Sequence, residues 1–149
     1  QLIFRKSSLS GADMNIDDKT LQALQASLKY RQMRQELINS NIANADTPGY
    51  KAKRLDFEEA LSRALDVDGK ESLKVEDEKH YDVGSGGFKS LSPEVYDDPN
   101  GIVTEDGNNV DRDHEMVLMA ENKVMYDAAV QLINKKLGLM KYILASESK

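Results

Sequence analysis

Apolar residues recur at helical spacing over two long stretches, one near each end of the chain. From about Thr20 to Ala45 nothing breaks this pattern, which predicts one long helix. Asp17 or Asp18 is placed to cap its start, where aspartate also suits the helix dipole. The apolar positions form two stripes on nearly opposite sides of the helix. One stripe comprises Leu21, Leu24, Leu28, Ile38, Ile42 and Ala45, and the other comprises Ala23, Ala26, Tyr30, Met33 and Leu37.

Two apolar stripes call for two partners, because a helix that rests on a single core needs only one stripe. The pattern leaves two arrangements open. In the first, a helix of the same chain covers one stripe and another subunit covers the other. In the second, the helix is the central member of a bundle and both sides are buried within one chain.

The second helical stretch begins at Asn109 or Asp111 and continues to about Ser146, with Asp111 and Asp113 making its first turn acidic. Its apolar arc is wider than one partner helix covers, and part of it repeats every seven residues, as in a coiled-coil seam. The residues of this repeat are Leu118, Met125, Leu132 and Leu139. The wider arc adds Val117, Ala128, Ala129, Ile133, Met140 and Ile143, and it is extended further by Tyr126, Val130, Leu137 and Leu144.

Residues 40–51, here called the corner segment, close the first helix. Pro48 lacks an N–H and restricts Thr47 to extended conformations, so the helix must end at or before Asp46. Pro48 and Gly49 fit the central positions of a type II turn, in which the second residue has a positive φ. The amides of Asn41 and Asn44 lie on one helix face, where they can bind the last carbonyls of the helix or a neighbouring chain. An ordinary helix stop and a recognition corner for assembly are both open interpretations. The candidate assembly motif comprises Asn41, Asn44, Asp46, Thr47, Pro48, Gly49 and Tyr50.

The middle of the chain has a different character. Apolar residues at a spacing of four predict a short helix over residues 56–66. The basic cluster before it is expected to be either a solvated patch or a local partner for the acids Asp56, Glu58 and Glu59. Residues 70–110 are rich in Gly, Pro, Asp, Asn and Ser, which predicts a small irregular or β-containing insert. Within it, Leu73 and Val75 suggest one short strand and Ile102-Val103 the second arm of a hairpin. The basic cluster comprises Lys51, Lys53 and Arg54.

The predicted fold is therefore mainly α, with long N- and C-terminal helices that pair as a coiled coil around a looped-out middle. Residues 16–47 and 111–147 would form one discontinuous domain, residues 48–110 the middle segment, and residues 1–15 a mobile arm. The helix-packing residues are expected to be Leu21, Leu24, Leu28, Met33, Leu37, Ile38, Ile42, Leu118, Met125, Leu132, Ile133, Leu139, Met140 and Ile143.

Composition narrows the classes of function. A net charge of −6 argues against nucleic acid as a partner, and the absence of cysteine excludes disulfides, thiolate metal sites and cysteine nucleophiles. His80 and His114 lie far apart in the sequence, and no arrangement of acid, base and nucleophile suggests catalysis. We predict a protein without catalytic, cofactor-binding or metal-binding residues. The two remaining candidates are a subunit that self-assembles through its helices and a soluble helical adaptor or export chaperone of discrete size.

Four segments carry a resemblance to a known family. Residues 41–51, Asn-Ile-Ala-Asn-Ala-Asp-Thr-Pro-Gly-Tyr-Lys, resemble the N-terminal motif of bacterial flagellar rod and hook proteins. Residues 55–61, Leu-Asp-Phe-Glu-Glu-Ala-Leu, together with residues 106–116 and 122–126, resemble the proximal rod members of that family. The resemblance covers about residues 20–65 and 105–145, and nothing is transferred to the first residues.

The resemblance implies a structural role outside the cytoplasm. A subunit of this kind is exported unfolded through the flagellar type III apparatus without a cleaved signal peptide, and it polymerises in the periplasm as part of the basal-body rod. Its terminal helices would form an inner coiled-coil layer, with the middle segment further from the axis. Its expected partners are further copies, other rod subunits, the export gate and basal-body adaptor proteins, and no nucleic acid, small-molecule substrate or cofactor is implied.

Overall fold

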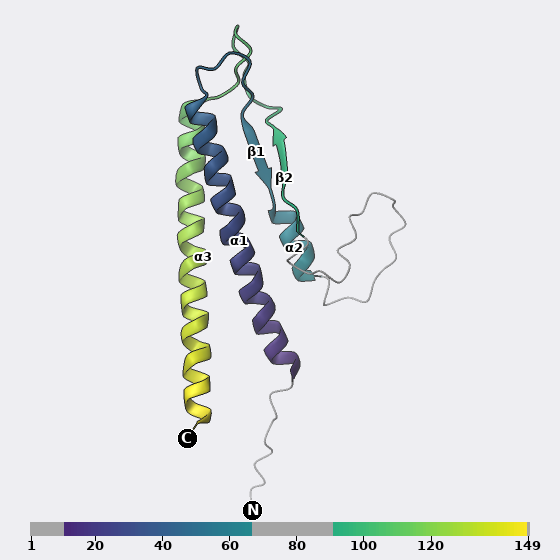
Figure 1. Cartoon of the computed structure of the whole chain (residues 1–149), viewed down its shortest axis with the longest axis vertical. Coiled ribbons are helices and arrows are strands. Elements are labelled where there is room, and N and C mark those ends of the chain that lie inside the picture. Colours follow the sequence, from purple (N-terminus) through teal and green to yellow (C-terminus); the bar gives the residue numbers. More distant parts are fainter. Residues whose placement is uncertain (1–10, 67–90, 149) are drawn as a thin grey trace, which may run out of the picture.

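The computed structural model describes residues 11–66 and 91–148, arranged as an elongated body in which two long helices run side by side (Figure 1). Both long helices and the short helix of the middle segment are present, so the predicted mainly α fold is confirmed. The elements in chain order are α1 (Gly11–Ala43), β1 (Lys53–Asp56), α2 (Glu58–Asp66), β2 (Glu94–Asp97) and α3 (Arg112–Glu147).

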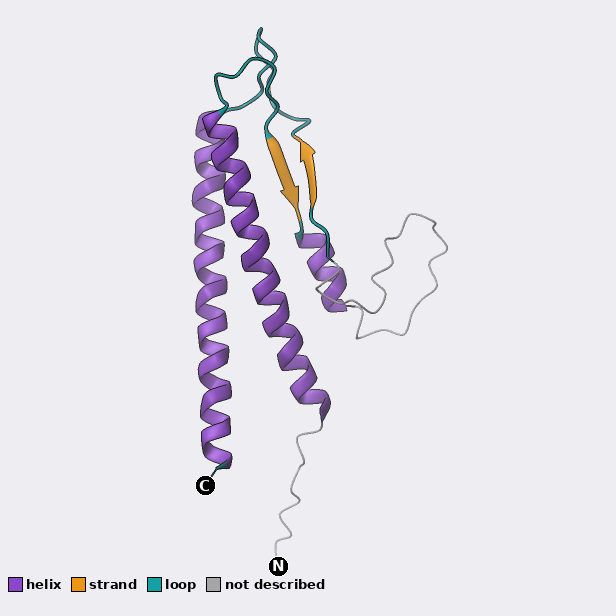
Figure 2. Cartoon of the chain, in the orientation of Figure 1, coloured by secondary structure: helices purple, strands orange, loops and turns teal. Residues whose placement is uncertain are grey.

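Helices α1 and α3 run in opposite directions, lie close together next to the corner segment and diverge toward the other end (Figure 1). The antiparallel strands β1 and β2 lie beside α1, with α2 continuing below them (Figure 2). Helix α1 contacts α3, β1 and α2. Both sides of α1 are therefore used within one chain, as in the bundle arrangement, and α1 is the central element of the fold.

The apolar core lies between α1, β1 and the start of α2. Tyr30, Leu55 and Phe57 are each at most 3% exposed, and the rings of Tyr30 and Phe57 have centroids 5.3 Å apart. The guanidinium of Arg34 lies 4.6 Å from the centroid of Phe57, which adds a cation–π contact. The Tyr30 hydroxyl donates to the carbonyl of Leu91 at 2.7 Å, and burial raises the pKa of this phenol. Three further residues of the second α1 stripe pack against this core: Ala26, Met33 and Leu37.

The first helix begins earlier than expected. Helix α1 starts at Gly11, so residues 11–15 belong to the helix, and Asp17 and Asp18 lie inside it and do not cap it. No glycine or proline follows Gly11 until the corner segment, so nothing in the backbone prevents this extension. Residues 1–10 lie outside the described residues. At its other end α1 stops at Ala43, before Asp46, as proline at position 48 requires.

The predicted hairpin is wrong in its second arm. Strand β1 pairs with β2, whereas Ile102 and Val103 lie in an irregular loop. A methyl group added at Gly101 would lie 2.8 Å from the carbonyl oxygen of Asn109, so the chain has already turned back on itself there. Leu73 and Val75, the expected first arm, lie outside the described residues.

Candidate assembly surfaces

The corner segment forms the predicted tight turn. Gly49 has a φ of +72°, and the Tyr50 N–H donates to the carbonyl of Thr47 at 3.2 Å, as a type II turn requires. The Gly49 N–H donates to the carbonyl of Asp106 at 2.8 Å, which ties the turn to the loop that precedes α3. No atom lies within 4 Å of a Cβ built on Gly49, so the need for glycine comes from the backbone conformation and not from space.

Asn41 is the centre of a buried polar network at this end of α1. Its side chain is 0% exposed and joins three elements. Its Nδ2 donates to the carbonyl of Lys53 at 3.0 Å and to Oε2 of Glu115 at 3.1 Å, and its Oδ1 accepts from the N–H of Lys53 at 2.8 Å and from the hydroxyl of Tyr50 at 3.2 Å. One amide therefore fixes the position of α1 relative to both β1 and α3.

A buried charge cluster continues this network. Arg54 contacts Glu115 at 2.7 Å and Asp98 at 2.9 Å, and the Glu115 side chain is 0% exposed. Burial alone would lower the pKa of Arg54, but hydrogen bonds to Glu115 and Asp98 and the charges of both carboxylates raise it overall. Burial alone would likewise raise the pKa of Asp98, but the backbone N–H of Asn100 and the side chain of Arg54 hold it below its usual value. Arg54 and Asp98 are therefore both charged near neutral pH, and the contact of Arg54 with Glu115 joins β1 to α3.

Two asparagines bind the loop before α3 to the corner segment and the adjacent Ala52 through hydrogen bonds. Nδ2 of Asn108 donates to the carbonyls of Asn44 and Thr47, both at 2.9 Å, so each of these carbonyls accepts a second hydrogen bond besides its backbone one. Oδ1 of Asn109 accepts from the N–H of Ala52 at 2.6 Å. These contacts explain why both asparagines are buried in a loop.

The candidate assembly motif divides into two halves. Asn41 is buried, and Asn44 and Tyr50 are half-buried and engaged in the network, with Nδ2 of Asn44 donating to the last-turn carbonyl of Ser40 at 2.8 Å. The other four residues of the motif face solvent, and among them Asp46 pairs with Arg112 at 2.6 Å. The outward-facing half comprises Asp46, Thr47, Pro48 and Gly49.

The basic cluster next to the corner segment binds partners far away in the sequence, which the sequence did not indicate. Lys53 pairs with Asp97, Arg54 with Asp98 and Glu115, and Lys51 donates to the carbonyl of Gly107. The expected partner Glu58 instead binds Arg34 through two hydrogen bonds, at 2.5 and 2.9 Å. Sequence reasoning missed six network residues: Arg54, Asp98, Asn108, Asn109, Glu115 and Asn122. For Glu115 and Asn122 the available signal was a polar residue within the apolar pattern of a helix, whereas Asp98, Asn108 and Asn109 lie in a polar loop where nothing in the sequence set them apart.

Helix α3 packs on α1 through a polar heptad position, and not through the apolar repeat predicted for the seam. Its buried residues are Glu115, Asn122 and Ala129, and Nδ2 of Asn122 donates to the carbonyl of Arg31 at 2.8 Å. The apolar repeat lies three residues further along the helix, which is only about 60° round the helix from the buried residues, so it borders the contact with α1 instead of being buried in it. We call Leu118, Met125, Leu132, Leu139 and Ile143 the α3 stripe.

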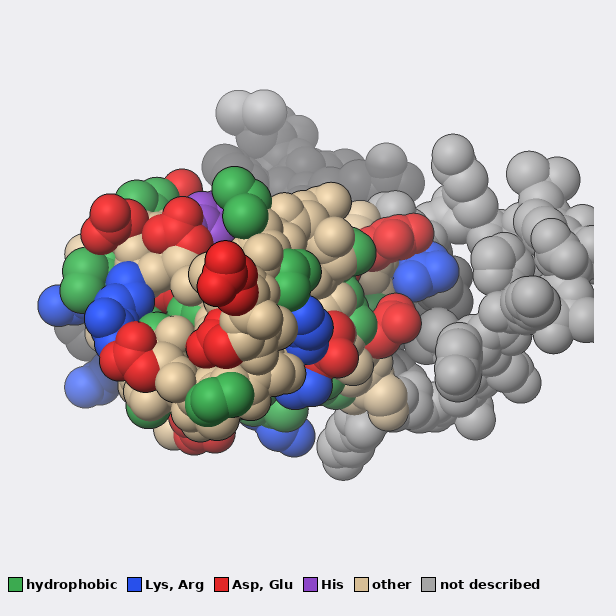
Figure 3. All heavy atoms as spheres, turned by 90° about the horizontal axis from the view of Figure 1, so that it is seen from above, with side chains coloured by type: hydrophobic (Ala, Val, Ile, Leu, Met, Phe, Trp, Pro, Cys, Tyr) green, Lys and Arg blue, Asp and Glu red, His purple; other side chains and the backbone are tan. Residues whose placement is uncertain are grey.

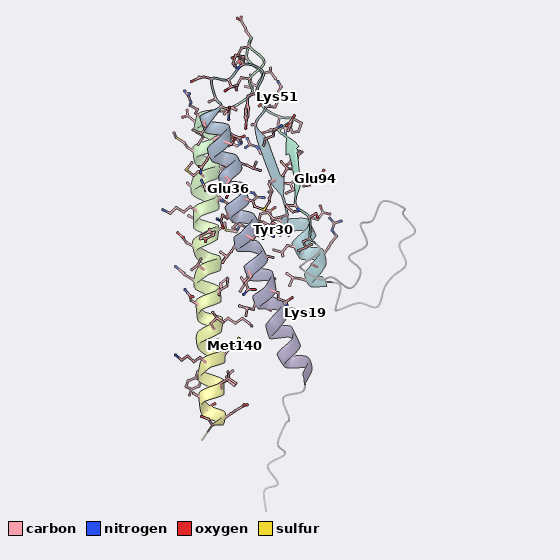
Figure 4. The ribbon with its side chains drawn as sticks, in the orientation of Figure 1. Lys19, Tyr30, Glu36, Lys51, Glu94 and Met140 are labelled. Carbon is pink, nitrogen blue, oxygen red and sulfur yellow. The ribbon has the colours of Figure 1, made fainter. Side chains whose placement is uncertain are left out.

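Most of the α3 stripe is open to solvent. Met125, Leu132, Leu139 and Ile143 are between 47% and 55% exposed, and Met140 beside them is 37% exposed. Figure 4 shows Met140 on the part of α3 far from the corner segment, which is marked by Lys51. Of the predicted α3 packing residues that follow Met125 in the sequence, Ile133 is half-buried and the others are exposed. Within the chain, the stripe residues after Leu118 therefore do not form the expected seam.

The upper end of the α3 stripe borders a groove between α3 and the two strands. The groove has a volume of about 410 Å³, with α1 as its floor. Leu118 and Met125 line one wall, and Leu55 and Tyr96 line the other. Among the described residues that line it, Nη1 of Arg54 and Oδ1 of Asn122 are buried without a hydrogen-bond partner. The groove thus offers apolar surface, and the two unpaired polar atoms are covered within the chain.

Comparison with known proteins identifies the family. The family model for flagella basal body rod proteins matches residues 20–51. FlgB of Bacillus subtilis strain 168 is 31% identical over 137 residues, which cover 88% of this chain and 97% of the relative. This chain belongs to the FlgB family of flagellar basal body rod proteins. FlgB of Aeromonas hydrophila is 36% identical over 127 residues, covering 83% and 92%, and FlgB of Salmonella typhimurium strain LT2 is 34% identical over 131 residues, covering 83% and 91%.

The match to the rod protein model falls on the part of this FlgB-family chain that holds the network together. Residues 20–51 contain α1 from Thr20 onward and the corner segment up to Lys51. Their network partners, such as Arg54 and Glu115, lie beyond that match, in the part that the full-length FlgB relatives cover. In the described part of the chain, no helix is long and apolar enough to cross a membrane.

Proposed function

We propose that this chain is a non-enzymatic structural subunit of the bacterial flagellar rod, which polymerises helically through α1 and α3. Its FlgB relatives are named as flagellar basal body rod proteins. The observation that carries the proposal is the exposure of the α3 stripe, where Met125 is 51%, Leu132 is 54% and Leu139 is 55% exposed. Apolar side chains at seven-residue spacing along a helix are typical of a surface that packs against another helix.

Burial of the α3 stripe would contribute favourably to the free energy of assembly. Complete burial of a leucine or methionine side chain contributes about 1.5–3 kcal/mol, so covering the exposed half of three such side chains contributes roughly 3 kcal/mol. In a helical assembly each subunit uses two different surfaces, and the same gain recurs at every contact. The α3 stripe supplies one surface of this kind.

The groove at the upper end of the α3 stripe extends the same surface. Leu118 and Met125 belong to the stripe and also line the groove, so a neighbouring helix that covers the stripe would reach it. This continuity of stripe and groove favours one alignment of the neighbour over its alternatives.

The corner segment would have two tasks in such an assembly. Its inward half, centred on Asn41, holds α1 and α3 in a fixed relation, so that the α3 stripe faces in a defined direction. Its outward half, residues 46–49, is exposed and available to a neighbouring subunit. The partners we propose are further copies of this chain, other rod subunits, the export gate and basal-body adaptor proteins, with the subunit located in the periplasmic rod after export from the cytoplasm.

The test is a pair of charges placed in the α3 stripe. We expect Leu132→Asp with Leu139→Asp to abolish polymer formation by the purified full-length chain and to abolish motility in cells. Asn134→Asp is the matched control, because Asn134 is exposed on the opposite side of α3. Sedimentation velocity and electron microscopy report polymer formation, and circular dichroism checks that both variants keep the helix content of the wild type.

Two outcomes would contradict the proposal. One is normal polymers and motility in the double variant. The other is a wild-type chain that forms a single oligomer of fixed size at every concentration, as expected of a soluble adaptor or export chaperone.

A further inference from the structure

Two apolar residues stand exposed on the loop at the corner end of the molecule. Ile102 is 90% exposed and Val103 is 55% exposed. The loop is nevertheless held by backbone hydrogen bonds, from the N–H of Thr104 to the carbonyl of Asn108 at 2.8 Å and from the N–H of Gly107 to the carbonyl of Thr104 at 2.9 Å. We call Ile102, Val103 and Glu105 the tip.

The tip lies among exposed acidic residues. Figure 3 looks down on this end of the molecule, where acidic and apolar side chains lie side by side. Of the bases nearby, Arg112 is paired with Asp46, and Lys51 donates to the carbonyl of Gly107. A partner for the tip should therefore combine apolar surface with positive charge. The exposed acids of this end are Asp46, Glu105, Asp106, Asp111 and Asp113.

The opposite end of α3 has this combination. Lys135, Leu139 and Tyr142 are spaced i, i+4 and i+7, so they share one face of the helix. All three are exposed, Leu139 to 55% and Tyr142 to 74%. We call these three residues the tail. The tip and the tail lie at opposite ends of the long axis of the molecule, so they do not meet within one chain (Figure 1).

We infer that the tip of one copy docks on the tail of the next copy, with Ile102 and Val103 against Leu139 and Tyr142 and Glu105 beside Lys135. A contact between two tips would bring acidic residues together, and like charges across an interface are unfavourable. Because the tip and tail are different surfaces at opposite ends, repeating this contact produces an open row of subunits and not a closed dimer. The inference rests on the proposed function and names one of its contacts.

Charge exchange tests the pairing. We expect Glu105→Lys alone and Lys135→Glu alone each to weaken self-association of the full-length chain by about three- to tenfold, because attraction becomes repulsion. The double variant should recover most of the loss. Glu94→Lys and Lys123→Glu are matched controls, since both residues are exposed and lie outside the tip and the tail. Single variants that associate like the controls, or a double variant weaker than either single one, would overturn the inference.

Cross-linking supplies a second readout, because the natural chain contains no cysteine. Under oxidising conditions, the Glu105→Cys/Lys135→Cys double variant should form a ladder of linked copies, whereas each single variant should stay unlinked. Dimers formed by Glu105→Cys alone would show that tips meet tips and would overturn the inference. If the purified chain does not polymerise, the same cross-linking is measured for these variants in basal bodies isolated from cells, with the same expected and contradicting results.

None of the residues changed in these two experiments belongs to the α3 stripe. Leu139 belongs to both the stripe and the tail, so the stripe variants alter both surfaces, whereas the charge-exchange and cysteine variants leave the stripe unchanged. If the stripe variants abolish polymers while the tip and tail variants leave them intact, the proposed function holds and the tip-to-tail contact is wrong. If the stripe variants have no effect, the proposed function fails on its own test, whatever the tip and tail variants do.

Discussion

Replacing Asn41 by alanine should destabilise the fold strongly, because this side chain makes four hydrogen bonds from a position that is 0% exposed. The change leaves the backbone N–H and carbonyl of Lys53 and one oxygen of Glu115 without these partners. Leaving a buried polar group unpaired costs about 1–3 kcal/mol, and such costs are not additive. We expect the free energy of unfolding to fall by about 3 kcal/mol in total.

Asn39→Ala is the matched control for this experiment. Asn39 lies on the same helix two residues earlier, is exposed, and accepts only an exposed hydrogen bond from Gln35 at 3.1 Å. An exposed substitution of this kind should change the stability by no more than about 0.5 kcal/mol. Urea unfolding followed by circular dichroism measures both variants. A difference between them below about 1 kcal/mol would refute the view that Asn41 holds the network together.

Asn41→Asp separates the role of the amide hydrogens from the role of shape. Aspartate keeps the acceptor for Lys53 but places a second carboxylate against buried Glu115, in place of the 3.1 Å hydrogen bond. Two carboxylates in one buried site raise the pKa of at least one of them in the folded state. A raised pKa means that folding is penalised at neutral pH and that the penalty shrinks as the pH falls toward the raised value. The stability gap to the wild type should therefore narrow on acidification, and a gap independent of pH would contradict this explanation.

Three further predictions concern the same end of the molecule. Gly49→Val should cost about 1–2 kcal/mol and impair motility, whereas Gly49→Asn should be tolerated because asparagine adopts positive φ more readily; equal motility of both variants in soft agar would contradict this. Asn108→Ala should cost about 2 kcal/mol in urea unfolding, because the carbonyls of Asn44 and Thr47 each lose one of their two donors and the N–H of Val110 loses its acceptor. Arg54→Met should raise the pKa of Asp98 in a carboxyl NMR titration, because the favourable partner that opposes burial is lost. Since the pKa of Asp98 is depressed in the folded wild type, its contribution to stability is present above the unfolded pKa and is lost as the pH falls through the folded value.

The sequence predicted the long helices and the corner turn because these depend on local chemistry. A helical repeat of apolar residues is visible along the chain, and Pro48 followed by Gly49 leaves few backbone conformations. The pairing of β1 with β2 was not visible, because each strand has only four residues and neither alternates clearly between apolar and polar positions. Strand pairing also depends on which distant segment of the chain lies alongside. Here the position of β1 depends on α1, because Tyr30 of α1 packs against Leu55 and Phe57.

Helix α3 shows most clearly why a pattern alone could not assign its two faces. It carries two heptad positions, one with polar residues such as Glu115 and Asn122 and one with the apolar α3 stripe, and hydrophobicity favours the second for the contact with α1. The polar position nevertheless faces α1, because the fold supplies its partners: Asn41 and Arg54 for Glu115, and the carbonyl of Arg31 for Asn122. A buried polar group tolerates only an alignment that satisfies it, so such a contact defines register more than it adds stability. The apolar face, which gains free energy against almost any apolar partner, is thereby left on the outside, and this division suits a subunit whose strongest contacts form only in the assembly.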